Sequence, residues 1–227
     1  MDLKKAAALK ALEFIKDNMS VGLGAGSSIA HLVTAIKEMQ ADGGLTVNLY
    51  TSSYSTKQLL LNNGFTAGDV SSITKLDIYF DGCDQFDKNL HALKSGGGIH
   101  TMEKLLASMA TRFIIIGDES KYSETLGTTF PLVLEVLPEA VPFVTMQVKK
   151  FFEDADVQLR MAAKKDGAVI TERGNLLLDV YVKFWHPLAI INPALKSISG
   201  IVETSLFYNM ADMAILGTAE GVKLMKR

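Results

Sequence analysis

The first half of the chain alternates short apolar runs with segments whose apolar residues recur at helical spacing. The strand-like runs lie within SVGLGAGSS, LTVNLYTSS, KLDIYFDG and RFIIIGDE, and SIAHLVTAIKEMQ, STKQLLLNNG and MEKLLASMA have helical periodicity. Before the first strand, residues 3–19 are predicted to form an amphipathic helix, because Leu9, Leu12, Phe14 and Ile15 recur at helical spacing with lysines between them. Strands that alternate with helices in this way favour a parallel sheet covered by helices, because each crossover helix packs back onto the sheet. We therefore predict an α/β fold with a mostly parallel sheet and helices on both faces.

The pattern changes near Pro131. PLVLEVLP is strand-like, VPFVTMQVKKFFEDA is helical, and VQLRMAAKKDGAVITERGNLLLDVYV is typical of antiparallel strands joined by turns. We predict a main domain from residues 1–128 and 202–227, and a smaller α+β domain from residues 129–201.

Composition limits the classes of partner. The formal net charge is −2, which gives no basic field for nucleic acid or an anionic membrane, so a small molecule is the expected partner. Cys83 is the single cysteine, and the four histidines show no ligand-like spacing with it, so we predict no metal site. No apolar run resembles a signal peptide or a membrane span, and we expect a cytoplasmic protein.

Polar and small residues gather directly after the predicted strands. In an open parallel sheet the loops at the carboxyl ends of the strands converge, and ligands bind there. The clusters that this rule brings to one edge of the sheet are Gly24–Ser28, Thr51–Ser53, Asp81–Asp84 and Gly117–Lys121.

The first cluster favours a phosphate site. Gly26, Ser27 and Ser28 precede a predicted helix, whose exposed N–H groups and positive dipole end could hold an anion. The glycines do not form G-x-G-x-x-G and no Gly-Lys-Ser/Thr follows, which disfavours dinucleotide binding and excludes a P-loop. The alternative is that these glycines only permit a tight strand-to-helix turn.

Charged residues follow the third strand. Asp81 and Asp84 could both accept hydrogen bonds from one small polyol, although an Asp-Gly pair after a strand is also a common turn. Lys94 precedes Ser95 and three glycines, a loop whose backbone could approach a ligand. Glu103, in the first turn of the next helix, is either a general base or a carboxylate that stabilises the helix end.

Three further side chains are less informative. His31 lies within a helical pattern and is predicted to be a half-buried packing residue and not a catalytic one, while His100 does not share a helical face with Glu103 and is left unassigned. Cys83 lies in the carboxylate turn and could be a reactive thiol, but no adjacent basic residue would lower its pKa.

Taken together, these motifs resemble type A ribose-5-phosphate isomerase along almost the whole chain. The family pattern is V-G-L-G-T-G-S-T, T-S-S, D-G-A-D-E-x-D, K-G-G-G-G-A-L-x-x-E-K, D-x-S-K, G-N-x-x-x-D and G-V-V-x-x-G-L-F. The corresponding segments here are VGLGAGSS, TSS, DGCDQFD, KSGGGIHTMEK, DESK, GNLLLD and GIVETSLF, in the same order and with the same spacing.

The resemblance implies a site and a chemistry. Glu103 would be the base of an aldose–ketose isomerisation, with Lys94, Asp81 and Asp84 around the sugar. The residues implied in substrate binding are Gly26, Ser27, Ser28, Ser53, Gly96, Gly97, Gly98, Lys121 and Lys4. The resemblance further implies a Rossmann-like main domain, a small ferredoxin-like domain, no metal or organic cofactor, and a homodimer or homotetramer that interconverts ribose 5-phosphate and ribulose 5-phosphate through an enediolate.

The chain departs from the family pattern at several positions. Ala25 replaces a threonine, Gln85 a glutamate and Ser95 a glycine, and Ile99, His100 and Met102 alter the start of the base-bearing helix. These changes leave a second hypothesis open, namely a protein that senses or binds sugar phosphates and has lost turnover. A coenzyme A transferase is a third hypothesis, but its glutamate nucleophile context is not evident.

Overall fold

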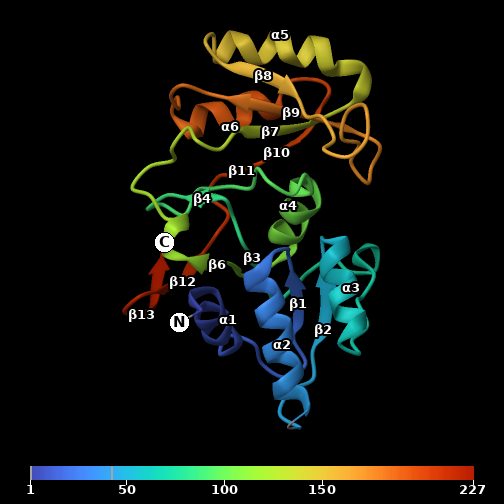
Figure 1. Ribbon diagram of the computed structural model, residues 1–227, viewed down its shortest axis with the longest axis vertical. Helices are drawn as coiled ribbons and strands as arrows, with labels where there is room; N and C mark the ends of the chain where they lie inside the picture. Colours follow the sequence, from blue (N-terminus) through green and yellow to red (C-terminus); the bar gives the residue numbers. More distant parts are fainter. Residues whose placement is uncertain (1, 42) are drawn as a thin grey trace. The chain divides into compact units, whose positions relative to one another are not determined.

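The structure is a computed structural model that describes residues 2–41 and 43–227. The chain divides into two compact units (Figure 1). Unit 1 comprises residues 1–83, 102–122 and 209–227, and unit 2 comprises residues 84–101 and 123–208. The predicted domains, 1–128 with 202–227 and 129–201, differ from these units mainly in the placement of residues 84–101, and their boundaries remain a prediction.

Unit 1 contains one six-stranded sheet in the order β13-β12-β6-β3-β1-β2. All neighbouring strands run parallel except β12 and β13, which form an antiparallel hairpin at one edge. The strands are β1 (Ser20–Leu23), β2 (Asn48–Thr51), β3 (Ile78–Asp81), β6 (Phe113–Asp118), β12 (Met213–Thr218) and β13 (Gly221–Lys226). The helices are α1 (Leu3–Leu12), α2 (Ser27–Ala41), α3 (Tyr54–Asn62) and α4 (His100–Met109), with short 3-10 turns η1 (Val70–Ser72) and η2 (Glu119–Lys121).

The strand order reverses between β1 and β3. From β1 the chain crosses outward to β2, and then returns to the other side of β1 to form β3, β6 and β12 in sequence. Open α/β sheets bind ligands beyond the carboxyl ends of the strands at such a reversal, which here are the ends of β1 and β3.

Strand residues alternate between the two faces of this sheet. Ile78 and Phe80 of β3 join a core that includes Ile114 of β6 and apolar residues of α1 and α2. The two helices lie side by side in Figure 1. Tyr79 and Asp81 point to the opposite face, because successive side chains of a strand alternate. The sequence prediction of a mostly parallel, helix-covered sheet is confirmed.

Helix α1 differs from its prediction. It ends at Leu12 instead of continuing to Met19, and its buried face consists of Ala7, Ala8 and Ala11. Leu9, which the helical pattern placed on the apolar face, is 47% exposed. Small side chains let the backbone of α1 approach the sheet closely, and an added Cβ at Gly217 would come within 1.8 Å of the Leu3 carbonyl oxygen.

Unit 2 contains a four-stranded antiparallel sheet in the order β10-β7-β9-β8. Its elements follow the order βαββαβ, the ferredoxin-like arrangement. They are β7 (Leu132–Val136), η3 (Pro138–Ala140), α5 (Val141–Phe151), β8 (Asp156–Leu159), β9 (Leu176–Tyr181), α6 (Leu188–Lys196) and β10 (Ile201–Thr204). The α+β character predicted for this part of the chain is confirmed, although α6 was not anticipated.

A small three-stranded sheet completes unit 2. Its order is β11-β5-β4, from β4 (Gln85–Phe86), β5 (Ala92–Leu93) and β11 (Leu206–Phe207). Strand β5 leads directly into the lysine and glycine loop, so the sheet fixes the start of that loop. Among the described residues, no helix has both the length and the apolar character needed to cross a membrane.

Candidate active site

Asp81 lies at the switch point of the unit 1 sheet. It is the last residue of β3, is fully buried, and its Oδ1 accepts hydrogen bonds from the backbone N–H groups of Ala25 at 3.1 Å and Gly82 at 2.8 Å. Its Oδ2 accepts a hydrogen bond from the Tyr79 hydroxyl at 2.7 Å. These hydrogen bonds satisfy a buried carboxylate, which would otherwise be costly to remove from water. They also join the loop after β1 to the end of β3.

Gly24 makes room for this carboxylate. A Cβ at Gly24 would lie 1.9 Å from both Cγ and Oδ1 of Asp81, a distance that no real contact allows. The Gly24 carbonyl also accepts a hydrogen bond from the hydroxyl of Thr56 on α3 at 2.7 Å. This glycine is therefore required by close packing against a charged side chain, in addition to any role in the turn.

Tyr79 is a buried polar residue of this site that the sequence analysis did not identify. Its hydroxyl lies 3.2 Å from the Ser52 hydroxyl as well as donating to Asp81. Burial, followed by the negative charges of Asp81 and Glu103, raises the pKa of Tyr79 well above its ordinary value. The phenol therefore stays protonated and remains a hydrogen-bond donor. The one available sequence signal was the spacing of Tyr79 and Asp81, which places both on one face of β3.

Glu103 belongs to the first turn of α4 and is buried. Its charge contributes to the raised pKa of Tyr79, so the carboxylates of Asp81 and Glu103 both act on the same phenol. The structure thus brings together, within unit 1, two of the carboxylates that the sequence analysis singled out. A protonated phenol that donates to one buried carboxylate and interacts with the charge of a second is an arrangement suited to proton-transfer chemistry.

The turn after β1 has the features predicted for an anion site. Gly26 has φ of +97°, a conformation that favours glycine, and α2 begins at the next residue. Ser27 is exposed and Ser28 is buried at the start of this helix. Ser53 caps α3, since its hydroxyl accepts a hydrogen bond from the Thr56 N–H at 3.2 Å.

Two lysines lie near the carboxyl end of β6. Lys4 Nζ is 3.8 Å from Asp118 Oδ2, and Lys121 ends the η2 turn. Burial alone would raise the pKa of Asp118, but hydrogen bonds from Ser120 and the charges of Lys4 and Lys121 outweigh it and lower the pKa. Asp118 thus forms an ion pair with Lys4, and its charge also interacts with that of Lys121.

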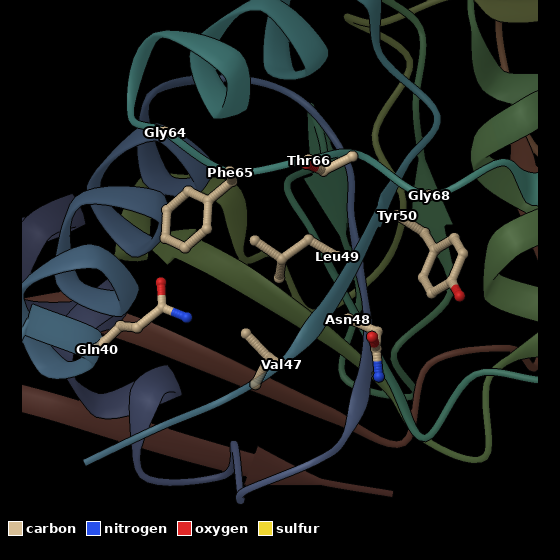
Figure 2. Close-up of a pocket in the computed structure, with 9 residues that line it drawn as sticks. All are labelled: Gln40, Val47, Asn48, Leu49, Tyr50, Gly64, Phe65, Thr66 and Gly68. Carbon is tan, nitrogen blue, oxygen red and sulfur yellow. The ribbon is translucent and has the colours of Figure 1, made fainter. Parts of the chain in front are cut away.

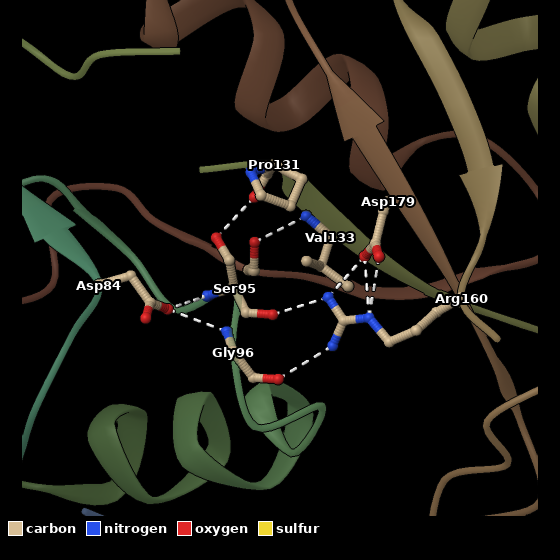
Figure 3. A network of polar contacts seen from close by, with 8 residues as sticks. Asp84, Ser95, Gly96, Pro131, Val133, Arg160 and Asp179 are labelled. Atoms are coloured by element: carbon tan, nitrogen blue, oxygen red, sulfur yellow. Dashed lines mark hydrogen bonds and ion pairs between the residues drawn. The ribbon is translucent and has the colours of Figure 1, made fainter. Parts of the chain in front are cut away.

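Within unit 2, Asp84 organises the glycine loop. Its Oδ2 accepts hydrogen bonds from the backbone N–H of Ser95 at 2.6 Å and of Gly96 at 2.9 Å (Figure 3). Lys94 is buried, its backbone N–H donates to the Ser205 carbonyl at 3.0 Å, and its Nζ lies 5.8 Å from the centre of the Phe207 ring. The structure therefore places Asp84 against the loop that follows Lys94.

Two departures from the family pattern have structural partners. The Ser95 hydroxyl donates to the Pro131 carbonyl at 2.6 Å, which tethers the loop to the start of β7. The Gln85 side-chain oxygen accepts a hydrogen bond from the Gly127 N–H at 2.7 Å. Neither substitution removes a predicted catalytic group.

The remaining singled-out residues have more ordinary surroundings. His31 is half-buried, and its Nε2 lies 3.1 Å from Oδ2 of Asp2, the residue that caps α1. The buried His100 ring lies 3.3 Å from the Glu203 carbonyl oxygen through Nε2. In the described ranges 2–41 and 43–227, no group of three His, Cys, Asp or Glu side chains could hold a metal ion.

A cavity of about 330 Å³ lies elsewhere in unit 1, beside the edge strand β2 (Figure 2). Phe65, Leu49 and Val47 point into it, and none of its lining residues is a predicted site residue. The described residues that line it carry no carboxylate, ammonium, guanidinium or imidazole group, in contrast with the charged residue at the carboxyl end of β3.

The fold and these residues define a class of protein: a doubly wound α/β protein with buried carboxylates, and a glycine turn that precedes a helix, at its switch point. Comparison with known proteins narrows the class. Residues 48–221 match the family model of ribose 5-phosphate isomerase A (phosphoriboisomerase A). The chain is 37% identical to ribose-5-phosphate isomerase A of Thermococcus kodakarensis, across 100% of this chain and 98% of the relative.

Solved structures agree. Ribose 5-phosphate isomerase A of Methanocaldococcus jannaschii superposes with a TM-score of 0.92 at 32% identity, covering 100% of this chain and 99% of that one. A D-ribose-5-phosphate isomerase in complex with phospho-erythronic acid superposes with a TM-score of 0.93 at 33% identity, covering 100% of both chains. The chain belongs to the ribose 5-phosphate isomerase A family.

Proposed function

We propose that the protein interconverts D-ribose 5-phosphate and D-ribulose 5-phosphate, an aldose–ketose isomerisation. The observation that carries the proposal is the pairing of two buried carboxylates, Asp81 and Glu103, with one protonated phenol at the switch point of a chain that belongs to this family. The metabolic setting would be the non-oxidative pentose phosphate pathway.

Glu103 is the base in this proposal. Its carboxylate removes the proton from C2 of the open-chain aldose, and the electron pair of that C–H bond becomes part of a C1–C2 double bond. The former carbonyl oxygen takes the negative charge of an enediolate. Glu103 then returns the proton to C1 while a proton moves from the oxygen on C2 to the oxygen on C1, which leaves the carbonyl at C2. One carboxylate suffices for both transfers.

The other carboxylates and Lys94 orient the sugar. Asp81 and Asp84 accept hydrogen bonds from its hydroxyls, and each is held by backbone N–H groups that fix its direction. Lys94 and the backbone N–H groups of Gly97 and Gly98 stabilise the developing negative oxygen, while the Gly96 N–H is bonded to Asp84. A preorganised donor in such a position is worth about 2.7–4 kcal/mol in the transition state.

The phosphate is held by Gly26, Ser27 and Ser28 at the start of α2. Lys4 and Lys121 supply positive charge, and Ser53, which follows β2, supplies a hydroxyl group. The N–H groups and positive dipole end of a helix such as α2, which spans Ser27–Ala41, favour a bound anion. A D-ribose-5-phosphate isomerase of 33% identity whose structure is in complex with phospho-erythronic acid supports a ligand that carries a phosphate.

Three further expectations belong to this proposal. The protein would act in the cytoplasm, as a homodimer or homotetramer, and without a metal or organic cofactor. Light scattering of the purified protein measures the oligomeric state, and the assay described next, run with and without a chelator, tests the need for a metal.

The test is an assay of the purified protein with D-ribose 5-phosphate, in which NMR spectroscopy follows ketose formation. Run in D₂O, the same assay reports whether solvent deuterium enters the sugar at the exchanging carbon. We expect turnover and deuterium incorporation. Binding of ribose 5-phosphate without turnover would instead favour a sugar-phosphate sensor.

A further inference from the structure

Arg160 occupies the centre of a polar network in unit 2 (Figure 3). It follows β8, and less than a fifth of its side chain is exposed. Its Nε lies 3.0 Å from both carboxylate oxygens of Asp179, and its Nη2 lies 2.5 Å from Asp179 Oδ1. Asp179 belongs to the neighbouring strand β9, so one edge of the guanidinium is fixed by the four-stranded sheet.

The other edge of the guanidinium faces the glycine loop. Arg160 Nη2 donates to the Ser95 carbonyl oxygen at 2.7 Å, and Nη1 donates to the Gly96 carbonyl oxygen at 3.1 Å. These residues lie 65 and 64 positions away in the sequence. The single cation therefore neutralises Asp179 and satisfies two consecutive backbone carbonyls, which a rigid planar fork can do and a single ammonium group cannot.

Asp84 holds one of these peptide groups from its opposite end. The peptide between Ser95 and Gly96 has its carbonyl bonded to Arg160 and its N–H bonded to Asp84. No cis peptide bond occurs in the described residues, so the N–H and C=O of each peptide point in opposite directions. Arg160 and Asp84 thus hold opposite sides of the loop.

The next peptide follows by the same geometry. Because the Gly96 carbonyl points to Arg160, the Gly97 N–H of that peptide points away from Arg160. Arg160 therefore sets the direction of a backbone donor in the loop that the proposed function assigns to the negative oxygen. Gly97 is exposed, and a Cβ there would meet only Ile99 Cγ1, at 3.5 Å.

We infer that Arg160 is a positioning residue for the isomerisation. It acts through the Ser95 and Gly96 carbonyls, on the side of the loop opposite the Gly97 N–H. In this way it directs the Gly97 N–H, and Lys94 immediately before Ser95, toward the enediolate oxygen. It does not contact the sugar. The inference rests on the proposed function, because it assigns Arg160 to the transition state of that reaction.

The test compares Arg160→Lys with the wild-type protein and with Arg112→Lys. Arg112 is exposed and lies over the Phe14 ring, 5.3 Å from its centre, so its replacement makes the same chemical change away from the loop. Each protein is assayed for kcat and KM with ribose 5-phosphate, and its thermal unfolding is followed by circular dichroism. Loss of one preorganised donor typically lowers kcat by about 10²–10³-fold, and partial misalignment is expected to lower it by at least about tenfold.

The inference predicts that Arg160→Lys remains folded and loses kcat at least tenfold, while KM changes less than threefold and Arg112→Lys matches the wild type. A folded Arg160→Lys protein with wild-type kcat, or with a change in KM alone, would overturn it. If Arg160→Lys does not fold, Asp179→Asn replaces it as the test, because it removes the carboxylate that holds the Arg160 guanidinium. The same result is expected, a fall in kcat with little change in KM. An inactive wild-type protein would instead refute the proposed function, which keeps the two failures distinct.

Discussion

The Tyr79 hydroxyl lies 2.7 Å from Asp81 Oδ2, and both side chains are buried at the end of β3. This contact connects the apolar interior of the sheet with its switch point. The Tyr79 ring packs where β1 has Gly22, since a Cβ at that glycine would lie 2.7 Å from Tyr79 Cδ2. The direction of the Asp81 carboxylate thus depends on a phenol that the core holds in place.

Replacement of Tyr79 by phenylalanine is expected to lower both stability and kcat. The variant keeps the ring and removes a hydrogen bond to a charged group, which typically contributes about 1.5–3 kcal/mol. We expect the free energy of unfolding to decrease by an amount in that range. We expect kcat to fall about tenfold, because the Asp81 carboxylate is no longer held in one direction. Urea denaturation and steady-state kinetics measure the two effects. Tyr54→Phe, at a residue 68% exposed, is the matched control, and equal behaviour of the two variants would contradict this role for Tyr79.

The same phenol predicts a dependence of stability on alkaline pH. The pKa of Tyr79 is raised in the folded protein, first by burial and then by the charges of Asp81 and Glu103. A group whose folded pKa is raised contributes stability that is fully present below its unfolded pKa, about 10 for tyrosine, and is lost as the pH rises further. The wild type should therefore lose stability above pH 10 more steeply than Tyr79→Phe does. Parallel curves from urea denaturation at several alkaline pH values would count against the assignment.

Gly24→Ala tests the close packing at Asp81. The new Cβ would lie 1.9 Å from Asp81 Cγ, so the carboxylate or the loop after β1 must move. We expect kcat/KM to fall by about 10²-fold or more, because small displacements at a reacting centre have effects of that size. Gly117→Ala is the control, since its Cβ would meet only the flexible Lys121 side chain at 3.5 Å. Steady-state assays of both variants measure kcat/KM. Equal values of kcat/KM for Gly24→Ala and the wild type would contradict the prediction, because they would show that the site tolerates the displacement.

Much of the unit 1 sheet could be predicted from sequence because its information is local. Apolar runs followed by glycines or carboxylates indicated β1, β2, β3 and β6, and the rule for parallel sheets placed the turn at Gly26 and the carboxylate Asp81 at the same edge. The position of Glu103 in the first turn of a helix also followed from local periodicity. These features depend on residues that are close together in the chain.

The supporting contacts could not be predicted because they join distant residues. Arg160 reaches Ser95 across 65 positions, and nothing in the sequence around MAAKKDG indicates that partner. Glu135 lies within the apolar run PLVLEVLP yet is buried, and it accepts hydrogen bonds from Thr101, from Thr171 at 2.9 Å and from Asn175 at 2.7 Å. Only the packed structure shows which polar groups satisfy one another.

Helix α1 shows the opposite limitation. Leucines at helical spacing indicated an apolar face that includes Leu9, but the sheet is covered instead by alanines. Leucine is more hydrophobic than alanine, so hydrophobicity alone predicts that leucine is buried. The backbone of α1 comes so close to the sheet, at Leu3 and Gly217, that alanine is favoured on the buried face. The local pattern thus identified a helix but assigned the wrong residues to its buried face.

The most direct measurement of the central claim is solvent proton exchange at C2 of ribose 5-phosphate by Glu103→Gln, followed by NMR spectroscopy in D₂O. Glutamine keeps the size of the side chain and cannot accept the proton, so the variant should bind ribose 5-phosphate with near wild-type affinity and show neither deuterium incorporation nor ketose formation. Deuterium exchange at the wild-type rate in the folded variant would contradict the assignment of Glu103 as the base.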